Sequence, residues 1–170
     1  MFSRTVQLQK NIHTIMNTLP QKGKVVWIGL RPEKKAMMQI VDSVTAQTDN
    51  GLTGDRYAGR TGKRQVTLVQ EEHLNAIASI LDRAHVPPEL LRRNIVVSKL
   101  NLLALKNKQF HIGNAIFEYT GLCHPCSYME EVFGDGGYNA VRGHGGITAR
   151  VIQSGIIKLN DSVHIFSPSN

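Results

Sequence analysis

The two cysteines of the chain stand three residues apart in the turn Cys123-His124-Pro125-Cys126. A thiolate is both a nucleophile and a ligand for soft metals. The turn could therefore be a redox pair, part of a structural zinc site, or the carrier of a single thiolate that binds sulfur or a soft metal centre. It could also be a buried pair without chemistry, because a free cysteine is often buried as a small hydrophobic residue.

The position of this turn in the chain bears on the four alternatives. A thioredoxin-like pair begins a helix after an early strand, whereas this turn comes late and follows a predicted hairpin. A zinc site needs four ligands, and only His144 would join the three ligands of this one tight turn. Burial alone does not call for Pro and His between the cysteines. The pattern therefore favours a single thiolate bound to a soft metal centre or to sulfur, and the other three interpretations stay open.

Arg92, Arg93 and Asn94 form a second polar cluster, directly before an apolar run at 95–97. Arginine matches the geometry of a phosphate with paired hydrogen bonds, and asparagine adds a donor. Two arginines at the end of a helix also suit the helix dipole, so a structural role is equally compatible with the pattern.

Glycine-rich segments at 51–62 and 134–146 are the third candidate feature. Glycines let backbone N–H groups approach an anion closely, although such segments also form plain turns. Neither segment matches a phosphate-binding P-loop or a dinucleotide-binding pattern. Arg142 and His144 in the second segment are candidate side chains facing a site.

Short apolar runs separated by turn residues predict the elements that position these features. Helical spacing is predicted for 3–19 and 70–83, for a short turn after Pro87-Pro88, and for 127–133. Strands are predicted at 24–30, 38–46, 64–69, 94–98, 110–112, 115–120 and 148–152, with two more ending near residue 166. Many short strands with few helices indicate an α+β domain around a closed or strongly curved sheet.

Composition limits the classes of function. The 170 residues carry a formal charge of +7, which favours anionic partners. The basic residues occur in scattered pairs and no nucleic-acid motif is present, so we expect no nucleic-acid partner. No apolar stretch is long enough for a membrane span and no secretory signal is evident, so we expect no membrane partner. Two cysteines without a multi-bridge framework fit a reducing cytoplasm.

The N-terminal segment 1–22 is predicted as an amphipathic helix that belongs to the same unit as the domain at 23–170. Its apolar side carries residues such as Val6, Ile12 and Ile15. We expect this side to pack on the domain or on a partner subunit, which is compatible with a homodimer.

Taken together, these blocks resemble the MOSC domain, named for the C-terminal domain of molybdenum-cofactor sulfurases, and in particular its short stand-alone bacterial members. The resemblance covers about residues 24–166, and the order of the blocks makes it specific. The blocks are GLTGDRYAG at 51–59, RQVTLVQEEHL at 64–74, RRNIVV at 92–97, FHIGNAIFEYTG at 110–121, LCHPCSYMEE at 122–131 and GGYNAVRGHGGITARV at 136–151.

The resemblance implies a mainly β fold, a MOSC-type β-barrel with a few peripheral helices, and binding of the molybdenum cofactor (molybdopterin). It implies that Cys126 is the metal ligand and catalytic residue, or a sulfur carrier, and that Arg92 and Asn94 help to hold the phosphate of the pterin. The Gly54-Asp55-Arg56 segment matches another family signature. Asp55 and Arg56 therefore join Arg142 and His144 as candidate cofactor-binding residues.

Two functions are compatible with the resemblance. The first is an oxidoreductase component that reduces a small N-hydroxylated substrate. The chain has no four-cysteine cluster motif and no dinucleotide motif, so its electrons would come from a flavin or iron–sulfur partner protein. The second is a module without turnover of its own, which carries sulfur as a persulfide on Cys126 or delivers the cofactor to another enzyme. A domain that has lost cofactor binding and keeps only the fold is a third possibility.

Overall fold

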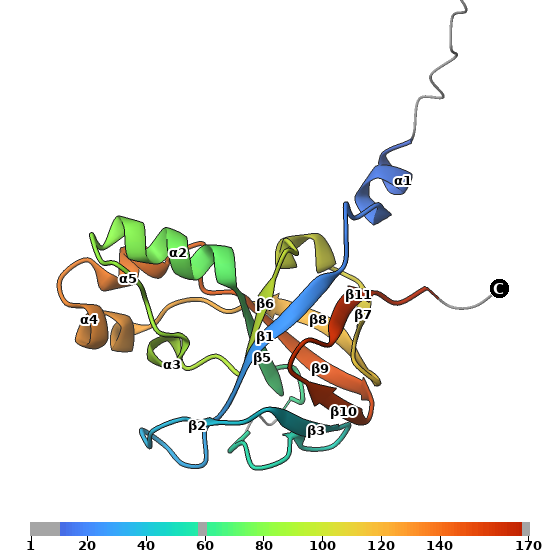
Figure 1. Cartoon of the computed structure of the whole chain (residues 1–170), viewed down its shortest axis with the longest axis horizontal. Coiled ribbons are helices and arrows are strands. Elements are labelled where there is room, and N and C mark those ends of the chain that lie inside the picture. Colours follow the sequence, from blue (N-terminus) through green and yellow to red (C-terminus); the bar gives the residue numbers. More distant parts are fainter. Residues whose placement is uncertain (1–10, 58–60, 168–170) are drawn as a thin grey trace, which may run out of the picture.

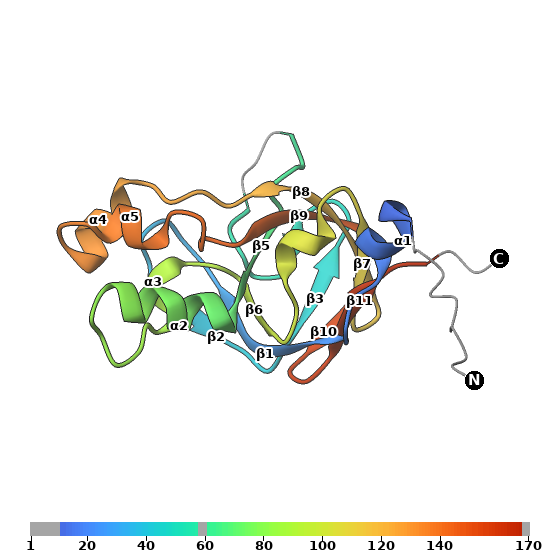
Figure 2. The same cartoon turned by 90° about the horizontal axis from the view of Figure 1, so that it is seen from above.

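The computed structural model of the chain describes residues 11–57 and 61–167, and Figures 1 and 2 show it from two sides. The strands are β1 (Gly23–Leu30), β2 (Gln39–Ile40), β3 (Ser43–Gln47), β4 (Gly51–Leu52), β5 (Val66–Gln70), β6 (Ile95–Ser98), β7 (Gln109–Ile112), β8 (Ala115–Leu122), β9 (Ile147–Gln153), β10 (Gly155–Lys158) and β11 (Ser162–Ile165). The helices are α1 (Ile12–Asn17), α2 (Glu71–Ile80), α3 (Pro88–Leu91), α4 (Ser127–Phe133) and α5 (Gly137–Val141), with a 3₁₀ turn η1 (Leu102–Leu105).

Seven strands close into a barrel in the order β11-β7-β8-β9-β5-β6-β1, and the pairing of β1 with β11 completes the ring. All of these pairs are antiparallel except β5 with β6. A parallel pair needs a crossover connection, which α2 and α3 provide. The predicted α+β class, mainly β with a few peripheral helices, is confirmed.

A second, smaller sheet has the strand order β10-β3-β4. The sequence predicts one strand over 38–46, but the structure divides this segment into β2 and β3. β2 pairs with β1 of the barrel, whereas β3 pairs with β10. The chain passes from one sheet to the other between these strands, so a single apolar run serves two sheets.

Two hydrophobic cores share the strands β5 and β6. Because successive side chains of a strand point to opposite faces, β6 places Ile95 and Val97 in the barrel core and Val96 in the core beneath the helices. In β5, Leu68 and Val69 divide in the same way. Figures 1 and 2 show α2, α3, α4 and α5 gathered on one side of the barrel. The start of β6 therefore lies where the two cores meet.

The helices on this side follow from local sequence. α2 buries Leu74, Ile77 and Ala78, which lie on one helical face, as the spacing in the sequence predicts. α3 begins with Pro88, whose missing N–H costs nothing in a first turn, and ends at Arg92 in the left-handed conformation with φ +54°. The predicted helix at 127–133 is found with the same bounds as α4.

The glycine-rich segment 134–146, for which the sequence predicts no regular structure, contains the short helix α5. Its capping group comes from α4. The Glu130 carboxylate accepts hydrogen bonds from the backbone N–H groups of Gly136 at 2.7 Å and Tyr138 at 2.8 Å. These bonds, the one from Tyr138 most strongly, lower the pKa of Glu130. Gly137 is required where the helices touch, because a Cβ there would overlap the carbonyl oxygen of Met129.

The predicted helix at 3–19 falls partly on residues 1–10, which lie outside the described residues. Its described part is α1, and none of the residues of α1 is buried. Ile12, Ile15 and Met16 are all more than half exposed. Within the described ranges, no helix combines the length and the apolar character that a membrane-spanning segment requires.

Candidate functional site

Cys126 directly precedes α4 and lines a pocket of about 420 Å³, which we call the cationic pocket. Its side chain is accessible, because Cys126 is exposed. The pocket lies between the loop after β1, the end of α3 and the first turns of α4. Its charged lining residues are six cations and one acid: Arg31, Lys34, Lys35, Arg56, Arg92, Arg93 and Glu131. Basic residues that are scattered in the sequence are therefore gathered around one thiol.

Arg31, the first residue after β1, is fixed by an ion pair with Asp55. The backbone N–H and Nε of Arg31 donate to Oδ1 of Asp55 at 2.7 and 3.0 Å, and Nη2 donates to Oδ2 at 2.7 Å. The Asp55 side chain is fully buried, whereas 19% of the Arg31 side chain is exposed. A two-point pair of this kind sets the plane of the guanidinium group. Asp55 therefore orients one of the pocket's cations.

Asn94 connects this ion pair to the barrel. Its side-chain nitrogen donates to the Gly29 carbonyl at 3.1 Å and to Oδ1 of Asp55 at 3.0 Å. Its side-chain oxygen accepts from Nη2 of Arg31 at 3.0 Å and from the backbone N–H and hydroxyl of Thr67 at 3.1 and 3.0 Å. The amide is fully buried, and both of its polar atoms are bonded within the protein.

Asn94 and Asp55, both predicted as cofactor-binding residues, do not line the cationic pocket. Both side chains are buried and form their hydrogen bonds with Arg31 and with the barrel. They fix the position of Arg31, and their binding of a cofactor stays a prediction.

Arg93 is the most deeply buried cation of the pocket, with 8% of its surface exposed. Nε donates to the Gly145 carbonyl and Nη1 to the Leu91 carbonyl, each at 2.7 Å. Burial is the largest influence on the pKa of Arg93 and lowers it, whereas the neighbouring Cys123 and Cys126 raise it. The guanidinium group thus lies within electrostatic reach of both sulfur atoms.

The second glycine-rich segment packs directly against the cysteine turn. The backbone N–H of Cys123 donates to the Gly146 carbonyl at 2.8 Å. A Cβ at position 145 would overlap the Cys123 carbonyl oxygen and would lie 3.3 Å from Nη2 of Arg93. The absence of a side chain at Gly145 therefore permits the close approach that links the cysteine turn to Arg93.

The two thiols have different surroundings. Cys123 is buried, with Nη2 of Arg64 at 3.9 Å from its sulfur, whereas Cys126 is exposed at the cationic pocket. Both are free cysteines. Across residues 11–57 and 61–167, no three His, Cys, Asp or Glu side chains are grouped to hold a metal ion, so the zinc alternative is not supported. The arrangement presents a single accessible thiol.

Arg142 and His144, which the sequence also predicts to face the site, do not line the cationic pocket. Arg142 is exposed at the end of α5. The His144 ring meets the His73 ring of α2 edge to face, with centroids 4.8 Å apart. Burial lowers the pKa of His73 most, His144 lowers it further, and Glu72 acts in the opposite direction. Gly143 and Gly146 adopt positive φ in this segment, and the described contact of the His144 ring is with His73.

Of the predicted residues, Cys126, Arg92 and Arg56 are brought together at the pocket. Sequence reasoning placed Arg93 in a possible phosphate-binding cluster but missed three further cations of the pocket, namely Arg31, Lys34 and Lys35. A signal for them was present. Arg31 directly follows the end of the first predicted strand, and Lys34-Lys35 is one of the few basic pairs of the chain.

Comparison with known proteins gives a family and a fold. A sequence model described as the MOSC domain matches residues 41–164. No curated protein sequence matches the chain. The YuaD protein of Bacillus subtilis aligns with a TM-score of 0.73 and 21% identity, over 86% of this chain and 98% of that one. YiiM of Geobacillus stearothermophilus gives 0.68 and 15% over 85% and 75%, and YiiM of Escherichia coli gives 0.67 and 18% over 89% and 72%.

Proposed function

The chain belongs to the MOSC domain family, which is associated with the molybdenum cofactor, and on that premise we propose that Cys126 is the protein ligand of the molybdenum in this cofactor. The observation that carries the proposal is the position of one exposed thiol in a pocket lined by six cations. A thiolate is a suitable ligand for a soft metal centre, and the cations suit an anionic pterin phosphate.

The residues present fit such a group. A volume of about 420 Å³ falls in the range of pockets that bind small molecules and cofactors. Arg31 is oriented by Asp55, and Arg93 by two backbone carbonyls, so these two guanidinium groups are held in place before a ligand arrives. Fixed donors bind an anion without the entropic cost of ordering long side chains.

Each part of the site then has a role. Arg31, Arg92 and Arg93 would hold the phosphate, since guanidinium groups match its geometry. Lys34 and Lys35, in the loop after β1, would add positive charge at the rim. Asp55 and Asn94 would keep Arg31 in position. Cys126 would hold the metal through its sulfur.

We further propose that the loaded protein reduces N-hydroxylated compounds. When bound, the cofactor would supply two-electron redox chemistry. Conversion of an N–OH group to N–H consumes two electrons and two protons and releases water. The electrons would come from a flavin or iron–sulfur partner protein, because the sequence has neither a cluster motif nor a dinucleotide motif.

The test is elemental analysis of protein purified gently from a host that makes the cofactor. We expect molybdenum near one atom per chain, together with pterin fluorescence, in the wild type and in the matched control Cys123→Ser, and loss of both in Cys126→Ser. Undiminished molybdenum in Cys126→Ser would contradict the assignment. No molybdenum in any of them, with a mass increase of one sulfur atom on Cys126, would replace the proposal by the sulfur-carrier function.

A further inference from the structure

His73 and His144 bring two imidazole rings into contact, one from helix α2 and one from the glycine-rich segment at 143–146. The rings meet edge to face with their centroids 4.8 Å apart. The Nδ1 atoms of both rings are buried and have no hydrogen-bond partner among the described residues. Buried polar atoms are normally bonded, so the protonation state of this pair has a direct structural cost.

The arrangement suits neutral rings and not charged ones. A neutral imidazole has one N–H and can leave Nδ1 as an acceptor without a proton, whereas an imidazolium has an N–H at both nitrogens. A buried Nδ1–H without an acceptor costs free energy, and two charged rings at 4.8 Å also repel each other. Protonation therefore favours separation of the rings.

The segment that carries His144 is the side of the contact that can move. His73 belongs to α2, whose apolar face is buried in the helical core. His144 is preceded and followed by glycines, and Gly143 and Gly146 adopt φ of +84° and +89°. Because glycine has wide conformational freedom, we expect separation of the rings to displace this segment and to leave α2 in place.

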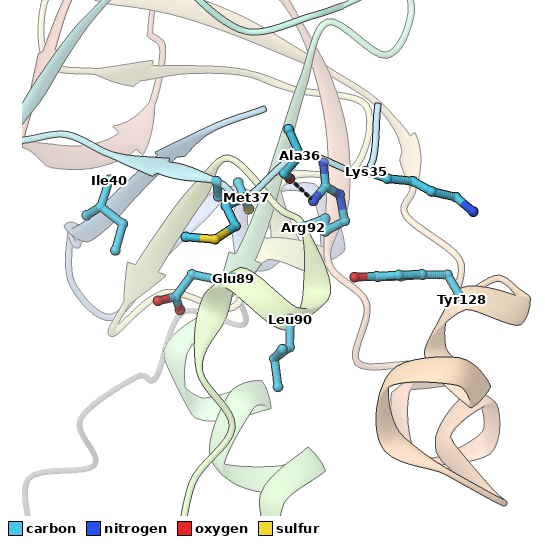
Figure 3. A pocket seen from close by; sticks show the side chains of 9 residues that line it. Lys35, Ala36, Met37, Ile40, Glu89, Leu90, Arg92 and Tyr128 are labelled. Carbon is cyan, nitrogen blue, oxygen red and sulfur yellow. Dashed lines mark hydrogen bonds between the residues drawn. The ribbon is translucent and has the colours of Figure 1, made fainter. Parts of the chain in front are cut away.

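Arg93 is a cation of the pocket that depends on the moving segment. Its Nε donates to the carbonyl of Gly145, the residue after His144, at 2.7 Å. Arg92 is held differently, since its Nη1 donates to the Ala36 carbonyl at 2.7 Å, drawn as the dashed line in Figure 3. Displacement of the segment would therefore remove a partner of Arg93 and leave the Arg92 contact intact.

The cysteine turn is held by the same segment. The backbone N–H of Cys123 donates to the Gly146 carbonyl at 2.8 Å, and Cys123 is 4% exposed. Gly143, Gly145 and Gly146 line a small pocket of about 130 Å³ together with Cys123. Opening of the segment would enlarge this pocket and uncover the Cys123 thiol.

Two neighbours act on His73 in opposite directions. Burial lowers the pKa of His73 most, His144 lowers it further, and Glu72 raises it. The Glu72 carboxylate also accepts a hydrogen bond from the backbone N–H of Lys99 at 2.7 Å. The folded pKa of His73 stays below its ordinary value of 6.5. A state with separated rings binds the proton more readily, so opening becomes more favourable as the pH falls below 6.5.

The other elements around the pair do not neutralise its charge. β5 and β6, which contact α2, carry no ionisable side chain, and α5 carries only the phenol of Tyr138. The sequence at 142–146 contains Arg142 and no acid, and His124 of the cysteine turn is exposed. Arg93 is bonded to the residue that follows His144. A proton on His144 would therefore add to positive charge.

We infer that the His73–His144 pair is a pH-sensitive switch for the cationic pocket. When both rings are neutral, the segment at 143–146 holds Arg93 and covers Cys123. When the pair is protonated, the segment moves away and releases both. The inference rests on the proposed function only for its consequence, which is weaker retention of an anionic cofactor in acid, because the opening itself needs no cofactor.

Labelling of Cys123 measures the opening without metal or turnover. In full-length Cys126→Ser protein Cys123 is the single thiol, and dithiodipyridine reacts with thiols in acid as well as at neutral pH. The labelling rate of urea-unfolded protein is divided by that of folded protein at the same pH, so the intrinsic reactivity of the thiol cancels. This protection ratio should fall by about tenfold or more between pH 8 and pH 5.

Uncharged replacements in the same Cys126→Ser background identify the cause. His73→Phe and His144→Phe keep a ring that cannot be protonated, so their protection ratios should change severalfold less with pH. His164→Phe is the matched control and should behave like the parent. His164 lies on β11, where it stacks on His111, and burial lowers its pKa most. His73→Gln and His144→Gln take the place of a Phe variant that the fluorescence of the single tryptophan shows to be unfolded.

A protection ratio that is constant with pH, or that falls equally in the His73 and His144 variants, would overturn the inference. Labelling that rises steeply with urea below the unfolding transition would also overturn it, because a local opening exposes little surface and global unfolding exposes much. The labelled protein contains no molybdenum. A negative result therefore leaves the Cys126 assignment intact, and a failure of metal loading leaves the switch intact.

Discussion

Arg31 and Asp55 are joined by two parallel contacts between guanidinium and carboxylate, Nη2–Oδ2 at 2.7 Å and Nε–Oδ1 at 3.0 Å. The carboxylate is fully buried and the guanidinium faces the cationic pocket. The positive charge of Arg31 at the site is therefore balanced by the buried negative charge of Asp55. Removing the negative partner should affect both folding and ligand retention.

Asp55→Asn should lower the free energy of unfolding by roughly 3 kcal/mol, because it leaves the largely buried Arg31 uncompensated. The matched control is Glu118→Gln, which breaks the ion pair with Arg150, whose side chains are 32% and 48% exposed. That change should cost less than about 1 kcal/mol. Urea denaturation of the three proteins provides the comparison, and equal losses would refute the special role of the buried pair.

Arg92 can be tested by two substitutions that differ only in backbone freedom. Its φ of +54° favours glycine. Arg92→Gly and Arg92→Ala both remove the cation, so each should retain severalfold less molybdenum and pterin. Arg92→Gly should nevertheless be more stable than Arg92→Ala by about 1 kcal/mol. Metal analysis after dialysis measures the retention of molybdenum. Retention equal to that of the wild type would show that Arg92 has a structural role only.

Gly145→Ala should distort the site by displacing the backbone of the cysteine turn. The new methyl group would overlap the Cys123 carbonyl and crowd Arg93. We expect about 1–3 kcal/mol of destabilisation together with loss of molybdenum. Gly121→Ala is the control, because its Cβ would meet only Oγ1 of Thr148 at an ordinary 3.5 Å. Thermal unfolding and metal content of the two variants should therefore diverge, and equal behaviour would contradict the proposed contact.

The His73–His144 pair predicts a pH dependence of stability. The pKa of His73 is lowered in the folded state from its ordinary value of 6.5, so the unfolded chain takes up a proton more readily. Its contribution to stability is present above 6.5 and is lost as the pH falls below that value. Unfolding free energies between pH 8 and pH 5 should decline less in His73→Phe than in the wild type. His144→Phe, which removes one cause of the shift, should have an intermediate slope, and an unchanged slope in both would disprove the coupling.

Local patterns in the sequence were sufficient for much of the fold. The β7–β8 hairpin pairs Ile112 with Ala115 around the two-residue turn that Gly113-Asn114 predicts, and α4 has its predicted bounds. α5 escaped prediction because its capping carboxylate, Glu130, belongs to another helix. Periodicity and turn residues predict structure from neighbours in the chain. They do not indicate a helix whose capping group comes from a different helix.

The sequence was sufficient to predict Cys126 but not all of the cations that surround it. Cys126 was identified because thiol chemistry is rare and its turn is distinctive. Arg31 was missed because its partners Asp55 and Asn94 lie 24 and 63 residues further along the chain. His144 was assigned to the site because histidine near glycines suggests a functional loop, whereas its ring packs against His73. The sequence shows where the basic residues lie along the chain, but only the tertiary contacts show that six of them surround one thiol.

The closure of the barrel by β1 and β11 makes assembly of the site a long-range event. Gly23 of β1 pairs with Val163 of β11, so the two strands that complete the ring lie far apart in the chain. Arg31 directly follows β1 and is bonded to Asp55 and Asn94, whereas Cys126 directly precedes α4. The cationic pocket therefore forms only with the tertiary structure, because contacts of large sequence separation must close long loops before they stabilise the chain.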